Sequence, residues 1–186
     1  MDHMIDEADI RGCLNKDPRS QKKVYETYLP LMLAIVRRYI SDREEALDVV
    51  NQGFIKVFDK IGQYHFENSF EGWCKRVIIN TALDHLRSNR RYKDLFSFEA
   101  MMPSFQVFND GISSMSIDEL YKIIDSISPI SKVVFNMYVI DGYSHKEISE
   151  ALNISVGTSK WHLSSARKQI QAKLKVAYPE VNLFYG

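Results

Sequence analysis

The chain of 186 residues is 45% hydrophobic and 26% charged, which is typical of a globular protein. Its 24 basic and 24 acidic side chains give a net charge of zero, so only local clusters of charge can indicate a nucleic-acid partner. Two cysteines without a CxxC pattern favour a reduced, cytoplasmic protein, and five scattered histidines disfavour a metal site. The acidic start does not resemble a signal peptide, and no stretch reaches the roughly 18 apolar residues of a membrane span, so we expect no membrane insertion.

Four helices are predicted in the first half, because apolar residues recur at helical spacing and strand-like alternation is absent. They span residues 6–16, about 20–40, about 43–61, and 68 into the basic run 88–91. Asp17 should end the first helix, since the residue before a proline avoids helical angles. Asp42 or Ser41 is expected to cap the third helix, and Asn68 the fourth, with Glu71 reaching back.

One face of each of the last three helices should form the core of the first half. The predicted inward residues are Val24, Tyr28, Leu31, Ile35 and Tyr39 in the second helix, Leu47, Val50, Phe54, Val57, Phe58 and Ile61 in the third, and Phe70, Trp73, Cys74, Val77, Ile78, Thr81 and Leu86 in the fourth. The pattern then breaks over residues 92–115, which hold Pro103 and Gly111 and indicate a linker. Its many large apolar residues suggest that it lies against its own domains or a partner.

The second half starts with a capping-box pattern at Ser116 that opens a helix to about residue 127. Ser128 should cap the next helix, which Gly142 closes. Another capping box at Ser144 starts a short helix, and a turn at residues 153–155 leads to a last helix over 156–177. The fold class predicted is all-α, with two small helical domains at 1–91 and 116–186 joined by the linker.

The stretch 142–170 has the helix, short turn and helix of a helix-turn-helix motif. Residues 144–175 carry six Lys/Arg and two acids, a local charge of +4. The inner stripe of the last helix is predicted to be Val156, Leu163, Ala166 and Ile170, and the side chains that face a DNA major groove are Thr158, Trp161, Ser165 and Lys168, with Lys160 and Ser164 at the edge. An ordinary surface helix is the alternative, but the compact turn and the cation excess together favour DNA binding.

A second cationic surface is expected on residues 75–93, where six Lys/Arg face one acid, a local charge of +5. Arg76, Asn80, Arg87 and Arg91 fall on one helical face, which suits a phosphate backbone. The preceding segment offers rings and amides that would stack on and read an unpaired base; these are Tyr64, His65, Phe66, Asn68 and Phe70. The alternative is a solvated face beside core aromatics, and Phe70 and Trp73 are expected in the core.

The third helix presents a polar face interrupted by one aliphatic residue, formed by Asp48, Asn51, Gln52, Ile55 and Asp59. By itself this pattern is typical of a solvated surface. No G-x-S-x-G, phosphate-binding glycine loop or HExxH occurs, so the sequence predicts neither an enzyme nor a cofactor.

From about Arg19 to Leu174, the chain resembles the extracytoplasmic-function (ECF) sigma factors of the sigma-70 family, the minimal type with regions two and four only. Residues 46–58 are similar to region 2.2, which in the family docks on the clamp coiled coil of RNA polymerase. The resemblance implies polymerase contacts at Asp48, Asn51, Gln52 and Ile55, although relatives more often carry Gln-Glu where this chain has Asn51-Gln52.

Residues 69–87 carry the pattern S-F-x-x-W-x-x-R, then N-x-A-x-D-x-L-R, of regions 2.3 and 2.4. In relatives this segment opens the minus-ten promoter element and holds a flipped non-template base. The minus-ten residues implied are Phe66, Asn68, Ser69, Arg76, Asn80, Arg87 and Arg91.

Residues 142–158 are close to the region-four signature, whose following helix reads the minus-thirty-five element. The minus-thirty-five residues implied are Thr158, Lys160, Trp161, Ser164, Ser165 and Lys168. Relatives often have arginine in place of His162 and Ser165, which predicts fewer phosphate contacts and a weaker salt dependence here.

The function predicted is that of a sigma factor, with core RNA polymerase, promoter DNA and an anti-sigma protein as partners. A polymerase-independent helix-turn-helix regulator is the alternative, but it requires only the second domain and leaves residues 43–91 unexplained.

Overall fold

A computed structural model of the chain describes residues 5–88 and 117–177. Within these ranges every regular element is helical, which confirms the all-α prediction. The chain divides into two compact units, Met1–Ser88 (unit 1) and Asn89–Gly186 (unit 2), and each is described by itself. The predicted linker, Arg91 and Ser116 lie outside the described residues.

Unit 1 contains α1 (Glu7–Leu14), α2 (Pro18–Val36), α3 (Arg43–Lys60), the short 3₁₀ helix η1 (Ile61–Gln63) and α4 (Phe70–Ser88). Asp6, Asp17 and Asp42 cap the first three helices, each with a side-chain oxygen that accepts from the backbone N–H three residues later. Asp42, rather than Ser41, is therefore the cap of α3.

Two helix ends in unit 1 differ from the prediction in detail. Asp17 has extended backbone angles as predicted, but α1 already ends at Leu14, and α2 begins at Pro18 rather than at about residue 20, because Pro18 occupies the first helical position and Asp17 caps it. Helix α4 begins at Phe70, so Ser69 and not Asn68 is its cap, and the Ser69 hydroxyl accepts from the Gly72 N–H at 3.3 Å.

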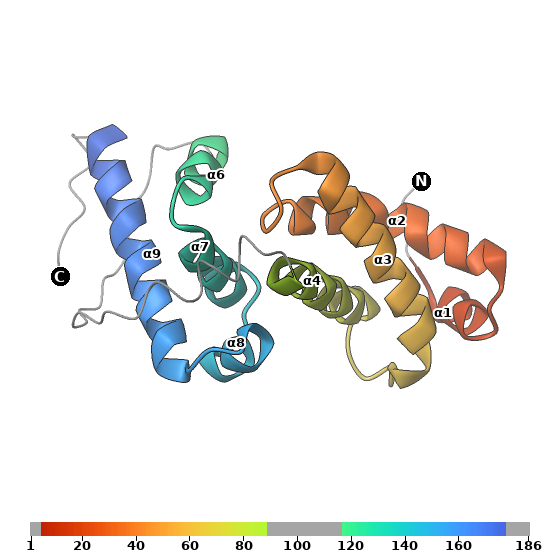
Figure 1. Ribbon diagram of the computed structural model, residues 1–186. Helices are drawn as coiled ribbons and strands as arrows, with labels where there is room; N and C mark the ends of the chain where they lie inside the picture. The colour runs from red at the N-terminus through yellow and green to blue at the C-terminus, as the bar shows by residue number, and fades with distance from the viewer. Residues whose placement is uncertain (1–4, 89–116, 178–186) are drawn as a thin grey trace. The chain divides into compact units, whose positions relative to one another are not determined.

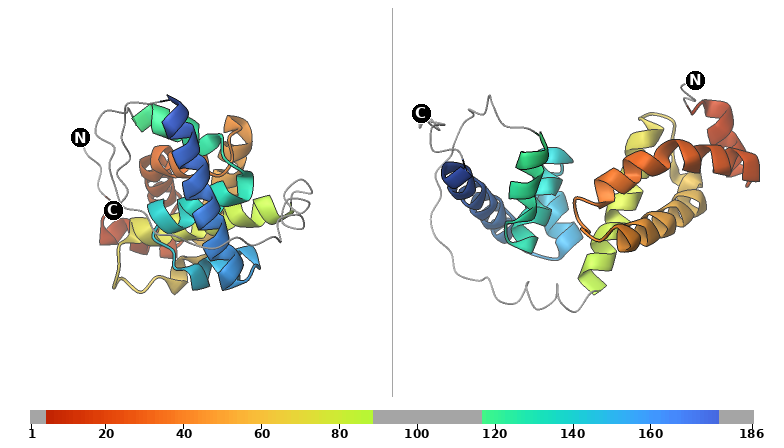
Figure 2. Two further views of the ribbon diagram at one scale, coloured as in Figure 1. Left: turned by 90° about the vertical axis from the view of Figure 1, so that its left-hand side faces the viewer. Right: turned by 90° about the horizontal axis from the view of Figure 1, so that it is seen from above.

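The largest packing surface of unit 1 lies between α3 and α4, which run side by side in Figures 1 and 2. The two helices come close at Gly53, where a Cβ atom would be 2.8 Å from Cγ1 and 3.4 Å from Cα of Ile78. On α2 the predicted core residue Leu31 is 41% exposed, and Met32 is buried in its place. Leu47 and Phe58 of α3 and Trp73 and Val77 of α4 are only half-buried.

Unit 2 contains α6 (Ile117–Asp125), α7 (Pro129–Phe135), the π-helical turn η2 (Asn136–Ile140), α8 (His145–Leu152) and α9 (Val156–Ala177). Helix α9 packs along α7 and α8 (Figure 1). Its predicted bounds are confirmed, as is the capping box of Ser144 with Glu147. Asn153 then adopts a left-handed conformation with φ 54°, which produces the sharp turn between α8 and α9.

The buried stripe of α9 differs from the prediction at its start. Val156 is 40% exposed, whereas Ser159 and His162 are buried with Leu163 and Ala166. Ser128 stands at the cap position of α7, but its hydroxyl accepts from Gln169 Nε2 at 3.2 Å and makes no cap bond. The Ser128 N–H donates to Gln169 Oε1 at 2.9 Å, so the start of α7 is attached to α9.

The close approach at Gly53 predicts that Gly53→Ala destabilises unit 1. Overpacking against the Ile78 backbone and side chain should lower the free energy of unfolding by about 1–3 kcal/mol. Gly62→Ala is the matched control, because nothing lies within 4 Å of a Cβ atom there. Urea unfolding of the full chain measures both, and equal stabilities of the two variants would contradict the packing described.

Candidate nucleic-acid interface

The side of α3 that faces away from α4 carries exposed polar and aliphatic side chains. Asp48 and Gln52 are exposed, and Ile55 is 61% exposed although it is aliphatic. We call these three residues the outer face of α3. Asn51 is only half-buried and its Oδ1 accepts from the Tyr25 hydroxyl at 2.9 Å, so this amide also belongs to the contact between α2 and α3.

Between η1 and α4, residues 64–69 form a loop that is closed by aromatic contacts, here called the aromatic loop. The Tyr64 ring lies 5.0 Å from the Phe66 ring, 5.1 Å from Phe70 and 5.8 Å from Trp73, measured between centroids. The Tyr64 hydroxyl donates to the backbone carbonyl of Asn68. The ring contacts and the hydrogen bond of Tyr64 therefore restrict the conformation of the loop.

Phe66 is displayed by this loop rather than buried in it. Its backbone has φ 56°, which is unusual for a residue with a side chain, and the residue is 39% exposed. Asn68 and Ser69 are exposed beside it, whereas Phe70 is buried as predicted. An exposed ring next to an amide and a hydroxyl is a suitable surface for stacking on and hydrogen bonding to a base.

The exposed side of α4 continues this surface with cations. Arg76 and Asn80 are exposed and Arg87 is half-exposed, while Arg91 lies outside the described residues. Asp84, the one acid among residues 75–93, forms an ion pair with Arg87 and another with Lys56 of α3 at 3.4 Å. Because two cations flank this single carboxylate, the exposed side of α4 stays positive and suits a phosphate backbone.

In unit 2, side-chain hydrogen bonds fix the two helices of the predicted helix-turn-helix. The Ser155 hydroxyl accepts from the Thr158 N–H at 2.9 Å and lies 2.8 Å from the Thr158 hydroxyl, so it caps α9. His145 at the start of α8 pairs through Nδ1 with the Ser159 hydroxyl at 2.9 Å, and its ring stacks on Tyr138 at 4.4 Å. The angle between α8 and α9 is therefore set by polar contacts as well as by apolar packing.

The six predicted groove residues of α9 differ in how they are engaged. Lys160 and Lys168 are exposed, and Trp161 and Ser164 are half-exposed. The Thr158 hydroxyl takes part in the cap, and the Ser165 hydroxyl accepts from Gln169 Nε2 at 3.0 Å. Sequence reasoning left out one further exposed cation, Arg167, which follows Lys160 at the helical spacing of seven residues.

His162 does not belong to this surface. Its side chain is 2% exposed, Nδ1 lies 3.4 Å from the Ser131 hydroxyl, and burial lowers the pKa of the imidazole to about 4. His162 therefore faces the core of unit 2, and the weaker salt dependence expected from the missing arginines stays a prediction. Sequence periodicity offered a signal, since residue 162 lies on the same face as Ala166 and Ile170.

Burial also raises the pKa of the Cys13 thiol to about 11 and raises that of the Cys74 thiol further. Neither cysteine therefore forms the nucleophilic thiolate readily at neutral pH. Among residues 5–88 and 117–177, no three His, Cys, Asp or Glu side chains form a cluster that could hold a metal ion. No helix in the same ranges is both long and apolar enough to cross a membrane.

Comparisons with known proteins agree with both units. Residues 24–92 match the family description "Sigma-70 region 2", and residues 117–170 match "Sigma-70, region 4". The ECF RNA polymerase sigma-E factor of Haemophilus influenzae is 21% identical, over 94% of this chain and 97% of its own length. The RNA polymerase sigma-H factor of Pseudomonas aeruginosa is 22% identical, over 92% and 97%.

Two solved structures share the fold. The sigma factor RpoE of Bartonella quintana, solved with the anti-sigma factor NepR, has a TM-score of 0.53 at 19% identity and covers 83% of this chain and 96% of its own. CnrH, solved with the cytosolic domain of CnrY, has a TM-score of 0.50 at 15% identity, over 91% and 96%.

The buried His162 predicts a pH-dependent stability of unit 2. The unfolded chain takes up a proton near the ordinary imidazole pKa of 6.5, whereas the folded unit resists it until about pH 4. The stability contribution is therefore complete above pH 6.5 and is lost as the pH falls toward 4, by about 3 kcal/mol at most.

His162→Gln should flatten this dependence in urea unfolding of the full chain between pH 7.5 and 5. A residual slope is expected from His145, since burial and then the nearby Lys160 and Arg167 also lower its pKa. His65→Gln, at an exposed histidine of unit 1, serves as the control for the loss of a histidine outside unit 2. A His162→Gln slope equal to the wild type would contradict the assignment.

Proposed function

The chain belongs to the sigma-70 family as an extracytoplasmic-function sigma factor, and we propose how its surfaces direct RNA polymerase to promoters. Region 2 is assigned to residues 1–91, region 4 to residues 116–186, and the linker to residues 92–115. The protein acts by recognition: it binds core polymerase and promoter DNA, and the polymerase supplies the chemistry. Since bacterial polymerase works in the cytoplasm, the protein is assigned to that compartment.

The outer face of α3 is proposed to bind core polymerase. Asp48 and Gln52 offer a carboxylate and an amide, and the 61% exposed Ile55 offers an apolar contact beside them. A large exposed aliphatic side chain within a polar patch is typical of a protein interface. Asn51 contributes less than the sequence suggested, because its Oδ1 is already bound to Tyr25.

The aromatic loop and the exposed side of α4 are proposed to act on the minus-ten element. Extruding a base from the duplex costs a few kcal/mol, and stacking on an aromatic ring recovers about 1–3 kcal/mol of it. Phe66 provides the ring, and Asn68, Ser69 and Asn80 provide polar groups to read the base. Arg76, Arg87 and Arg91 are proposed to hold the adjoining phosphates.

Helix α9 is proposed to read the minus-thirty-five element in the major groove. Lys160 and Lys168 suit phosphates at the groove edges, and Trp161 and Ser164 lie on the face between them. The hydroxyls of Thr158 and Ser165 are already hydrogen-bonded to Ser155 and Gln169 of the same unit when the helix meets DNA.

The observation that carries this function is the aromatic loop of unit 1, which displays Phe66 beside a cationic helix. A polymerase-independent regulator that binds duplex DNA through unit 2 has no use for that loop. An anti-sigma protein is proposed as a further partner, because the sigma factor RpoE and CnrH, which share the fold, were each solved with another protein bound, in the case of RpoE an anti-sigma factor.

The double variant Asp48→Ala with Gln52→Ala tests the polymerase surface. Loss of two polar contacts should weaken the binding of core polymerase about tenfold or more, with an unchanged unfolding temperature. Glu26→Ala with Gln63→Ala is the matched control, because it removes one exposed acid and one exposed amide elsewhere in unit 1. Wild-type affinity in the Asp48/Gln52 variant, measured by fluorescence titration, would remove the outer face of α3 from the polymerase contact.

Variants of α9 separate phosphate contacts from base contacts. Lys168→Ala should weaken holoenzyme binding to all upstream sequences alike and reduce the salt slope by about one. Trp161→Ala should instead reduce discrimination between upstream sequences. Lys122→Ala, an exposed cation on α6, is the control. If both α9 variants bind a panel of upstream sequences as the wild type does, α9 does not read the promoter.

A further inference from the structure

Helix α1 lies within the residues assigned to region 2, but none of its side chains has a role in the function proposed above. It precedes the segment that matches region 2, which begins at Val24. Yet α1 is attached firmly to the rest of unit 1, and one of its side chains lies on the aromatic loop. The contacts on both sides of this helix therefore call for an explanation.

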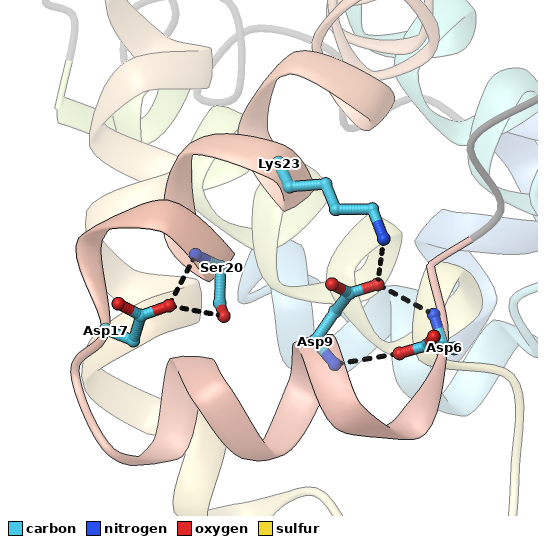
Figure 3. A network of polar contacts seen from close by, with 5 residues as sticks. All are labelled: Asp6, Asp9, Asp17, Ser20 and Lys23. Carbon is cyan, nitrogen blue, oxygen red and sulfur yellow. Dashed lines mark hydrogen bonds and ion pairs between the residues drawn. The ribbon is translucent and has the colours of Figure 1, made fainter.

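On one side, α1 is anchored to α2, as Figure 3 shows. Lys23 Nζ of α2 donates to Asp9 of α1 at 2.6 Å, and this carboxylate also accepts from the Asp6 N–H. Gly12 lets the helices approach closely, because a Cβ atom there would lie 2.1 Å from the Ser20 hydroxyl. Ile10 and Cys13 are buried beneath the helix.

On the other side, Arg11 reaches the aromatic loop. Its guanidinium carbon lies 5.1 Å from the centre of the Phe66 ring, within the range of a cation–π contact. Glu7, one turn earlier on α1, accepts from Arg11 Nε at 2.8 Å and also from the Nη2 group. The hydrogen bonds with Glu7 thus orient the Arg11 guanidinium that lies over the Phe66 ring.

Few contacts within the aromatic loop restrict the Phe66 ring. The Phe66 backbone is in the left-handed region, the residue is 39% exposed, and the Tyr64 ring packs against it in a tilted arrangement. Arg11 is a second contact and comes from a separate, anchored helix. Together Tyr64 and Arg11 restrict the ring that is proposed to stack on an unpaired base.

We infer that Arg11 is a positioning residue for base recognition: α1 holds its guanidinium over Phe66 and so keeps the aromatic loop in the shape that accepts an unpaired base. This inference rests on the proposed role of the loop. Arg11 acts through Phe66, and the discrimination between bases at one position of the non-template strand depends on it.

The test uses holoenzyme formed with the full chain and four forked promoter probes that differ only in the base at the captured position. Arg11→Ala should reduce the affinity ratio of the best to the worst base by about two- to fivefold. Arg11→Lys, which keeps a cation for the ring, should retain most of the ratio. Arg19→Ala, which removes an exposed arginine from the start of α2, should retain all of it.

A double-mutant cycle with Phe66→Leu gives a second readout. If Arg11 acts through the ring, Arg11→Ala should cause no further loss of discrimination in the Phe66→Leu background. Additive losses would overturn the inference. So would an equal drop in affinity for all four probes with a reduced salt slope, because that result indicates a direct phosphate contact. A wild-type holoenzyme that binds the four probes equally would instead overturn the proposed role of the loop, and this inference with it.

Discussion

The close packing of α3 on α4 at Gly53 is the constraint on which unit 1 depends. Each helix uses one face for the other, and Ile78 fills the space that a side chain at position 53 would take. The opposite faces are consequently held apart by the core. Asp48 on α3 and Arg76 on α4 are both exposed, so the proposed polymerase surface and the proposed nucleic-acid surface use different helices of the same small bundle.

A chain with no net charge can still bind DNA, because its acidic and basic side chains gather on different helices. Acids gather at the first turns of α1 and α3, where they also cap and favour the helix dipoles. Cations gather on the exposed side of α4 and on α9, and Asp84, the one acid among residues 75–93, is paired with Arg87 and Lys56. In unit 2, the buried residues Ser159 and His162 and the left-handed turn at Asn153 orient α9. Lys160 and Lys168 remain exposed on this helix.

Sequence patterns predicted the helices well and their details less well, for physical reasons. Capping boxes and a left-handed turn residue are local features, so Ser144 and the bounds of α9 were predictable. Leu31 was misplaced because its apolar character does not say which face a helix buries. The burial of His162 was not predicted, because it depends on Ser131, a residue distant in sequence that lies beside the imidazole. The attachment of α1 to the aromatic loop is likewise a tertiary contact that no local pattern encodes.

Photo-crosslinking tests the central claim, that two faces of one bundle contact polymerase and DNA at the same time. A photoreactive amino acid would replace Ile55 on α3 or Asn80 on α4, both exposed positions, in holoenzyme bound to a promoter. Position 55 should crosslink to a polymerase subunit, and position 80 to the minus-ten DNA. Crosslinks from position 55 to DNA, or from position 80 to polymerase alone, would contradict the account.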